Sequence, residues 1–369
     1  MKILLINWQD IKNPYGGGAE VHAHEIMKRL VKKGHKVFQF SCKFDGCFDY
    51  EEIDGIKIFR KGLRNTFNFI VPFWYFKLFK KMNFDIIIDD INKIPFYTPL
   101  YVKEPILAIS HHFFGKSIFR ETNIFFGLYV LIAEYLVNFV YKNTNFAVVS
   151  ESTLQEFKER NFNTSQFKIV YNAFDKENFP MKLSEKYETP TITYFGRLKK
   201  YKSIDHLFYC FSNLLKIYPN AKLEIIGKGD YRENLENLAK KLNISNNVIF
   251  HGFVDDNKKI ELLSKSWIVV NTSMKEGWGI TNIEANACGT PVVSANVPGL
   301  KDSVKDGFSG YLYEYGNIKD LENKISYLLE NNKLRNELSK NAIEWANNFS
   351  WESSAQILEN FCFEIINKQ

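Results

Sequence analysis

The sequence predicts an α/β protein made of two similar domains, each a parallel β-sheet covered by helices. The chain has 369 residues, which exceeds the size at which one hydrophobic core usually keeps growing, so two domains are the first expectation. Short apolar runs alternate with longer helical patterns, as is typical of parallel sheets with helices on both faces. This alternation stops near residue 174 and starts again near residue 192.

The strand-like runs and the helical patterns follow one another in the same order in both halves. Helices are expected near Glu20–Lys33 in the first half, and near Ser203–Ile217 and Arg232–Leu242 in the second. The expected strands are Ile3–Ile6, Lys36–Phe40, Ile86–Ile88, Ile106–Ile109, Ala147–Val149, Ile192–Phe195, Leu223–Ile226, Val248–Phe250, Ile268–Asn271 and Val292–Val293. We therefore expect two doubly wound, Rossmann-like domains.

The two halves are separated by residues 174–190, which are rich in charge and have no apolar period. This segment predicts a first domain at residues 1–180 and a second at residues 188–345. Open α/β sheets bind ligands at the carboxyl ends of their strands, so we expect both sheets to face one cleft that holds the site.

Composition excludes several classes of protein. The net charge of +6, from 48 basic and 42 acidic residues, is too small and too mixed for a nucleic-acid binder. The five cysteines lack zinc spacing and are expected to be reduced thiols, with no metal site. The apolar start at Met1–Ile6 predicts a strand, not a signal peptide. Glu134 and Asn138 interrupt Ile124–Val140, which is shorter than the roughly 20 apolar residues of a spanning helix.

A glycine-rich loop follows the expected strand Ile268–Asn271. Gly277 and Gly279 allow the backbone to approach a ligand, and a helix that starts near Ile280 and Thr281 would direct its free N–H groups at an anion. The loop is therefore a candidate phosphate site, with these four residues as candidate donor-binding residues.

Glu276 and Glu284 flank this loop, and each carboxylate can accept hydrogen bonds from sugar hydroxyls. The alternative is that both are solvated charges at a helix end. Together with the Gly-Thr-Pro-Val-Val run at 289–293, the pair resembles the E-x7-E signature of glycosyltransferase family 4, whose fold is GT-B. The resemblance implies that Glu276 approaches the donor sugar and Glu284 the ribose hydroxyls.

Arg197 and Lys202 follow the first strand of the second half. A guanidinium fork with an ammonium group suits a diphosphate. The segment is similar to the G-R-L-x-x-x-K-G motif of the same family, although Ser203 replaces the second glycine. The resemblance implies that both cations bind the donor diphosphate, whereas the alternative makes them ordinary surface cations of a basic run.

Two further strand ends resemble the places where this family binds the nucleotide base and ribose. They carry Gly227 and Gly229, and then Phe253 and Val254. For Phe253 the alternative is a simple core residue.

Gly16, Gly17 and Gly18 follow the first strand and open a helix, which forms an anion-binding turn. The loop is similar to the N-terminal glycine-rich loop of the family, which approaches the donor phosphates and the acceptor. Val21 stands where G-x-G-x-x-G would need its third glycine, so no dinucleotide cofactor is expected.

His111 ends the strand Ile106–Ile109, and many members of the family have one histidine there, near the reacting carbon of the sugar. His112 is the alternative match, and either could be a structural hydrogen-bonding group. The final segment, 346–369, resembles the part of these proteins that packs back on the first domain.

The acceptor side is expected in the first domain, where basic residues between Lys57 and Lys81 are interleaved with aromatic ones and no acid occurs before Phe84. This pattern suits an anionic membrane surface or a lipid-linked diphosphate acceptor. The alternative is a core helix with solvated lysines. Ile124–Val140 is either an interfacial helix or a helix that packs between the domains.

The resemblance thus implies a retaining glycosyltransferase that moves a sugar from a nucleotide diphosphate sugar to a glycan or lipid-linked acceptor, in cell-surface polysaccharide or glycolipid synthesis. The resemblance implies no cofactor and no essential metal. We expect a cytoplasmic protein, at the inner face of the membrane, with no nucleic-acid partner. The alternatives are a sugar-nucleotide epimerase or phosphorylase of similar fold, and a protein that binds nucleotide sugars without turnover.

Overall fold

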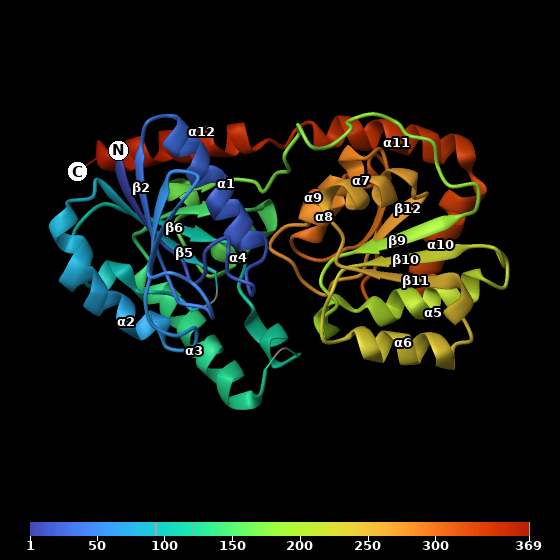
Figure 1. Cartoon of the computed structure of the whole chain (residues 1–369), viewed down its shortest axis with the longest axis horizontal. Coiled ribbons are helices and arrows are strands. Elements are labelled where there is room, and N and C mark those ends of the chain that lie inside the picture. The colour runs from blue at the N-terminus through green and yellow to red at the C-terminus, as the bar shows by residue number, and fades with distance from the viewer. Residues whose placement is uncertain (93, 121, 369) are drawn as a thin grey trace. The chain divides into compact units, whose positions relative to one another are not determined.

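A computed structural model describes residues 1–92, 94–120 and 122–368. The chain divides into two compact units, which are drawn in Figure 1. The first unit is Met1–Ala173 together with the chain from Trp351 onward, and the second unit is Phe174–Ser350. The second unit therefore starts before residue 188, and the returning segment starts after residue 346.

Two aromatic side chains explain why the second unit begins so early. Phe174 and Phe179 are buried, and their rings meet edge to face at 5.2 Å. The backbone N–H of Met181 then donates to the carbonyl of Ala287 at 3.2 Å. Phe174 and Phe179 are too widely spaced to give an apolar period. The sequence pattern is therefore dominated by the charged residues around them, which indicate a linker.

The described residues of the first unit form an eight-stranded sheet in the order β3-β4-β2-β1-β5-β6-β7-β8. All pairs are parallel except the hairpin of β3 and β4. The strands are β1 (Lys2–Ile6), β2 (Lys36–Ser41), β3 (Tyr50–Ile53), β4 (Ile56–Arg60), β5 (Ile86–Ile91), β6 (Ile106–Ser110), β7 (Asn145–Val148) and β8 (Phe167–Ile169). The central strands are almost wholly buried because helices cover both faces.

The helices of the first unit include the last helix of the chain. They are α1 (Gly18–Lys32), α2 (Phe67–Trp74), α3 (Ile124–Val140), α4 (Glu151–Glu159) and α12 (Trp351–Ile366), with short turns η1 (Tyr75–Phe79), η2 (Lys80–Met82), η3 (Thr98–Leu100), η4 (Gly115–Arg120) and η5 (Thr164–Gln166). Helix α12 packs on α1, where Arg29 pairs with Glu352 at 2.7 Å and Lys33 with Glu359 at 2.6 Å.

Residues 174–350 contain a six-stranded parallel sheet in the order β11-β10-β9-β12-β13-β14. Its strands are β9 (Thr191–Phe195), β10 (Lys222–Ile226), β11 (Val248–Gly252), β12 (Ile268–Asn271), β13 (Val292–Ala295) and β14 (Gly310–Tyr313). Its helices are α5 (Ile204–Leu214), α6 (Arg232–Lys241), α7 (Asp256–Lys265), α8 (Ile280–Ala287), α9 (Leu300–Ser303), α10 (Ile318–Glu330) and α11 (Asn332–Ala346), with turns η6 (Lys200–Lys202) and η7 (Ser245–Asn247). In Figure 1, α5 and α6 lie on one side of this sheet, and α7 and α8 lie on the other.

Helices α2 and α3 both expose apolar side chains. In α2 and η1, one side packs in the core through Phe67, Val71, Tyr75 and Phe79, whereas Phe69, Phe73 and Phe76 are exposed. Helix α3 buries only Gly127, Ala133, Glu134 and Val137. None of the helices formed by the described residues combines the length and the apolar character needed to cross a membrane.

Candidate active site

The strand order of the second sheet brings two predicted charged residues together. Strand β9 lies next to β12, so Lys202 in η6 and Glu276 in the loop after β12 meet at the carboxyl ends of these strands. The Lys202 ammonium pairs with Glu276 Oε1. Ser273 Oγ donates to the same carboxylate oxygen at 2.5 Å, and Thr272 Oγ1 donates to the Lys202 carbonyl at 2.9 Å.

This ion pair is mostly buried, with side-chain exposures of 14% for Lys202 and 18% for Glu276. Burial alone would lower the pKa of Lys202, but Glu276 together with the neighbouring Tyr201 and Tyr194 outweighs burial, and the pKa is raised. Lys202 therefore stays cationic. The alternative interpretations of Lys202 as a surface cation and of Glu276 as a solvated charge are wrong. Arg197, by contrast, is exposed.

Gly227 and Gly229 allow the loops after β9 and β10 to touch. A Cβ atom on Gly227 would lie 1.9 Å from the carbonyl oxygen of Gly196, and Gly227 has a φ of +136°. A Cβ atom on Gly229 would lie 1.9 Å from the carbonyl oxygen of Leu198. Both glycines thus have a packing role that holds the loop carrying Arg197 in place.

Helix α8 begins at the same edge of the sheet. Gly279 is its N-cap, and Ile280 and Thr281 form its first turn, so their N–H groups and the positive end of the helix dipole point out of this edge. Gly277 lies in the loop immediately before, between Glu276 and the helix. A Cβ atom on Gly279 would lie 2.3 Å from Ser303 Oγ, so close packing also requires that glycine.

Glu284, one turn further along α8, forms an ion pair that the sequence did not predict. Lys259 Nζ in α7 lies 2.9 Å from Glu284 Oε1, and each side chain is 12% exposed. Lys259 also pairs with Asp256 at 2.8 Å. Burial raises the pKa of Glu284, and the charge of Lys259 opposes that shift. Glu284 is therefore not a solvated helix-end charge.

Lys259 carries a sequence signal that is visible in retrospect. It lies three and four residues before Leu262 and Leu263, which are buried, so it shares the buried face of α7. Its ammonium lies 5.3 Å from the centre of the Phe179 ring and 5.6 Å from that of Phe195. A lysine on a buried helix face beside aromatic rings needs a carboxylate partner, and Glu284 is that partner.

Phe253 and Val254 follow β11 at the same edge. Phe253 is 74% exposed, so the alternative that it is a core residue is wrong. The Lys228 ammonium lies 5.4 Å from the centre of its ring. Val254 is partly exposed. An exposed aromatic ring beside the ends of β10 and β11 has a free face on which a planar base can stack.

The first unit builds a second cluster at the carboxyl ends of β1, β5 and β6, which are neighbours in the sheet. His111 Nε2 lies 3.0 Å from Asp90 Oδ1, and Asn7 Nδ2 donates to Asp90 Oδ2 at 2.7 Å. All three side chains are buried. Asp90 and Asn7 were not predicted. The signal for Asp90 was an acid inside the apolar strand Ile86–Ile91.

His22 of α1 lies against His111, with ring centres 5.3 Å apart. Its Nε2 is 3.1 Å from the Val170 carbonyl. Burial and the neighbouring His111 lower the pKa of His22 from 6.5 to about 3, so His22 is neutral at physiological pH. His112, the other candidate, is only partly buried, and its ring lies 5.0 Å from Phe114. The structure therefore places His111, not His112, in the buried cluster.

The loop Gly16–Gly18 joins this cluster to α1. Gly17 is the N-cap of α1, and its N–H donates to Glu20 Oε2 at 2.6 Å. Asn92, just after β5, donates to the other Glu20 oxygen at 2.6 Å. The glycine loop is thus held at the same edge of the sheet as His111. No group of three or more metal-binding side chains occurs among the described residues.

Comparisons with known proteins identify the family and the fold. Residues 16–178 match Glycosyltransferase Family 4, and residues 175–345 match Glycosyl transferases group 1. An uncharacterized glycosyltransferase of Methanocaldococcus jannaschii is 28% identical over 84% of each chain. Sucrose-phosphate synthase from Thermosynechococcus elongatus superposes with a TM-score of 0.82, at 19% identity and over 100% of both chains.

The Anabaena protein HepE, solved in complex with UDP-glucose, superposes with a TM-score of 0.72 at 19% identity, over 98% of this chain and 99% of that one. The two parallel α/β units have the GT-B fold. The chain belongs to the group 1 glycosyltransferases of family 4.

Proposed function

We propose that this glycosyltransferase is a retaining hexosyltransferase that uses a nucleotide diphosphate sugar and glycosylates a glycan or a lipid-linked acceptor in cell-surface polysaccharide or glycolipid synthesis. The observation that carries the proposal is the convergence of Lys202, Glu276 and the start of α8 at one edge of the second sheet, with Arg197 in the loop before η6. The UDP-glucose bound by HepE supports a nucleotide sugar as donor.

In this proposal the donor diphosphate lies against the N-terminus of α8. Arg197 and Lys202 neutralise the charge that the diphosphate gains as the bond to the sugar breaks. Lys202 then shares its ammonium between a phosphate oxygen and Glu276. The other carboxylate oxygen of Glu276 accepts hydrogen bonds from the donor sugar, and Glu284 accepts them from the ribose. The nucleotide base stacks on Phe253.

In this proposal the reaction needs no metal, because Arg197, Lys202 and the N-terminus of α8 stabilise the negative charge of the leaving group. A donor phosphate oxygen takes the acceptor proton on the face that the leaving group occupies, which retains the anomeric configuration. We assign to His111, which Asp90 holds, and to Gly16–Gly18 the roles in catalysis and substrate binding that the family resemblance implies. The enzyme works in the cytoplasm at the inner face of the membrane.

The test is nucleoside diphosphate release from a panel of nucleotide sugars, with and without a membrane extract as acceptor and with and without EDTA. The proposal expects one sugar nucleotide to give acceptor-dependent release that EDTA leaves unchanged. A sugar-nucleotide epimerase would interconvert the sugar without releasing nucleotide. A binding protein would shift its melting temperature with the ligand and release nothing. Either of these results would overturn the proposal.

A further inference from the structure

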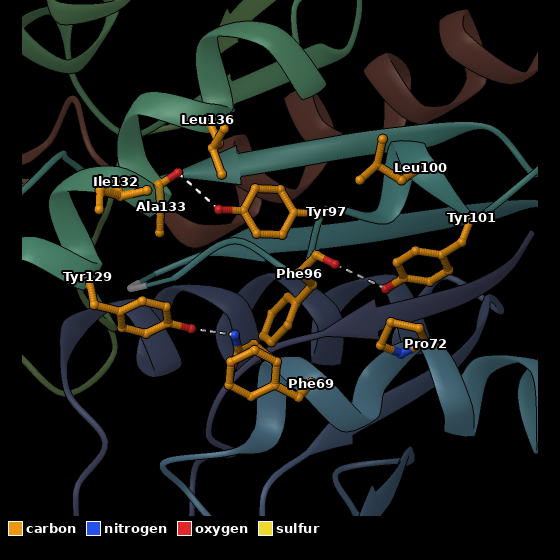
Figure 2. A pocket seen from close by; sticks show the side chains of 11 residues that line it. Phe69, Pro72, Phe96, Tyr97, Leu100, Tyr101, Tyr129, Ile132, Ala133 and Leu136 are labelled. Atoms are coloured by element: carbon orange, nitrogen blue, oxygen red, sulfur yellow. Dashed lines mark hydrogen bonds between the residues drawn. The ribbon is translucent and has the colours of Figure 1, made fainter. Parts of the chain in front are cut away.

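The first unit contains an apolar pocket between α2 and α3 (Figure 2). Its volume of about 370 Å³ is in the range of sites that hold small molecules. The pocket is lined by Asn68, Phe69, Pro72, Phe96, Tyr97, Leu100, Tyr101, Tyr129, Ile132, Ala133 and Leu136.

The pocket is lined in part by the connection between β5 and β6, which forms no α-helix in the described residues. Parallel neighbouring strands are usually joined through a helix that covers the sheet. Between Ile91, the end of β5, and Ile106, the start of β6, the described residues form only the short turn η3 (Thr98–Leu100). Phe96 and Tyr97 of this connection line the pocket together with residues of α2 and α3.

The polar atoms of the lining are largely occupied by the protein itself. The hydroxyls of Tyr97 and Tyr101 donate to backbone carbonyls at 3.1 and 3.2 Å, and the Tyr129 hydroxyl accepts from Asn68 Nδ2 at 2.8 Å. These bonds are drawn in Figure 2. Asn68 Oδ1 is buried without a partner among the described residues. The pocket therefore offers ring and methyl surfaces, which suit a hydrocarbon.

The pocket opens among exposed apolar side chains. On α3, Phe125 is 81% exposed, Ile132 60% and Phe139 61%, and on α2 Phe69 is 66% exposed. Several large exposed apolar side chains on two helices that line one pocket favour a site of interaction with a membrane or a partner.

Cations adjoin the same surface. The ring of Phe76 lies 6.2 Å from that of Tyr101, which lines the pocket, and the Lys80 ammonium lies 5.2 Å from the centre of the Phe76 ring. The Lys77 ammonium lies 4.9 Å from the neighbouring Trp74 ring. Both lysines are exposed. An apolar pocket with cations at one side complements a molecule with a hydrocarbon chain and an anionic head group.

We propose that this pocket binds the hydrocarbon chain of a lipid-linked acceptor whose phosphate group lies near Lys77 and Lys80. This inference rests on the proposed function, because it names the class of acceptor for the same enzyme. The chain enters between α2 and α3. The head group stays outside the pocket on the basic side, and the acceptor glycan extends from it.

The experiment is calorimetry of the full-length protein with farnesyl phosphate, which has a branched hydrocarbon chain and a phosphate, and with inorganic phosphate as the chainless probe. Leu136→Trp fills the pocket from α3. Leu100→Trp fills it from η3, where the side chain is 70% exposed, so the fold is not at risk. Phe139→Trp is the matched control, because residue 139 lies one turn along α3 and does not line the pocket.

Farnesyl phosphate is expected to bind the native protein and the Phe139→Trp variant equally, and inorganic phosphate to bind neither detectably. Each pocket-filling variant should weaken binding about tenfold, the factor expected when two methylene groups lose their burial. Absence of farnesyl phosphate binding to the native protein would overturn the inference, and so would pocket-filling variants that both bind it as tightly as the native protein does. Nucleoside diphosphate binding is measured on the same samples. If it persists while farnesyl phosphate binding is absent, the acceptor class alone is wrong and the proposed donor chemistry stands.

Discussion

Lys259 and Glu284 form a largely buried ion pair, 2.9 Å from Nζ to Oε1, that joins α7 to α8 beside the proposed donor site. The pair fixes the position of Glu284, and the charge of Lys259 opposes the rise in the pKa of this carboxylate that burial causes. A charged carboxylate is the better acceptor for ribose hydroxyls. We therefore propose that Lys259 positions Glu284 for nucleotide binding.

Replacement of Lys259 by Met should weaken nucleoside diphosphate binding by about tenfold, the cost of one hydrogen bond to a charged group. Because the pKa of Glu284 would rise further, the loss should grow as the pH falls from 7 to 5.5. Calorimetry with UDP and GDP measures both effects. Lys258→Met is the control, since Lys258 is exposed and pairs with Glu261 on the same helix. Equal affinities for the two variants would remove Lys259 from the site.

Lys202 should matter for turnover and also for stability. Replacement by Met removes a cation from the leaving group, and turnover should fall on the order of 100-fold. It also leaves Glu276 without its ionic partner, which should lower the free energy of unfolding by about 1–3 kcal/mol, less than for a fully buried pair. Lys200→Met, an exposed residue of the same turn, should change neither quantity. Urea unfolding measures the free energy of unfolding, and nucleotide release measures turnover. Normal turnover in Lys202→Met would contradict the proposal that Lys202 binds the donor diphosphate.

His22 should make the fold sensitive to acid. Its pKa is about 3 in the folded protein and 6.5 as its ordinary value. Between these values only the unfolded chain takes up the proton, so its contribution to stability is complete above pH 6.5. That contribution is lost as the pH falls, by about 1.4 kcal/mol per pH unit. His22→Gln, whose amide can still donate to Val170, should lose less stability between pH 7 and 5. The free energy of unfolding of both proteins is measured by urea unfolding at the two pH values. If both lose the same stability between pH 7 and 5, His22 titrates normally.

The basic residues beside α2 should attract the protein to anionic lipid. Lys77→Gln with Lys80→Gln should weaken binding to phosphatidylserine vesicles by about 2 kcal/mol, on the order of 30-fold, at low salt. The attraction should fade at high salt because screening is short-ranged. The control is Lys240→Gln with Lys241→Gln, two exposed lysines at the end of α6. Sedimentation that is the same for both double variants would show that η1 and η2 do not contact the membrane.

The parts of the fold that were predicted from the sequence are those with strong local patterns. Strands such as β1 and β12 consist mainly of continuous apolar runs, which are typical of a buried parallel strand. The hairpin strand β3 (Tyr50–Ile53) escaped prediction because it lies at the sheet edge and is half polar. The missing crossover helix after β5 was also not foreseen, since three-residue turns such as η3 leave no periodic signal.

The candidate site divides in the same way. Glu276, Glu284 and Lys202 could be named because they lie in glycine-bearing segments that resemble a family signature. Lys259 and Asp90 could not, because their roles depend on residues distant in sequence, Glu284 and His111, that only the packing of neighbouring elements brings close. The order of strands and helices in space brings such charged partners together. No short pattern in a single sequence indicates which residues will pair.

The central claim is that the edge of the second sheet binds the nucleotide diphosphate. A crystal structure of the chain with UDP, or with whichever nucleotide binds in calorimetry, tests it most directly. The account predicts the diphosphate within hydrogen-bonding distance of Arg197, Lys202 and the first N–H groups of α8, with the ribose on Glu284. A nucleotide bound elsewhere, with the Lys202–Glu276 pair undisturbed, would contradict it.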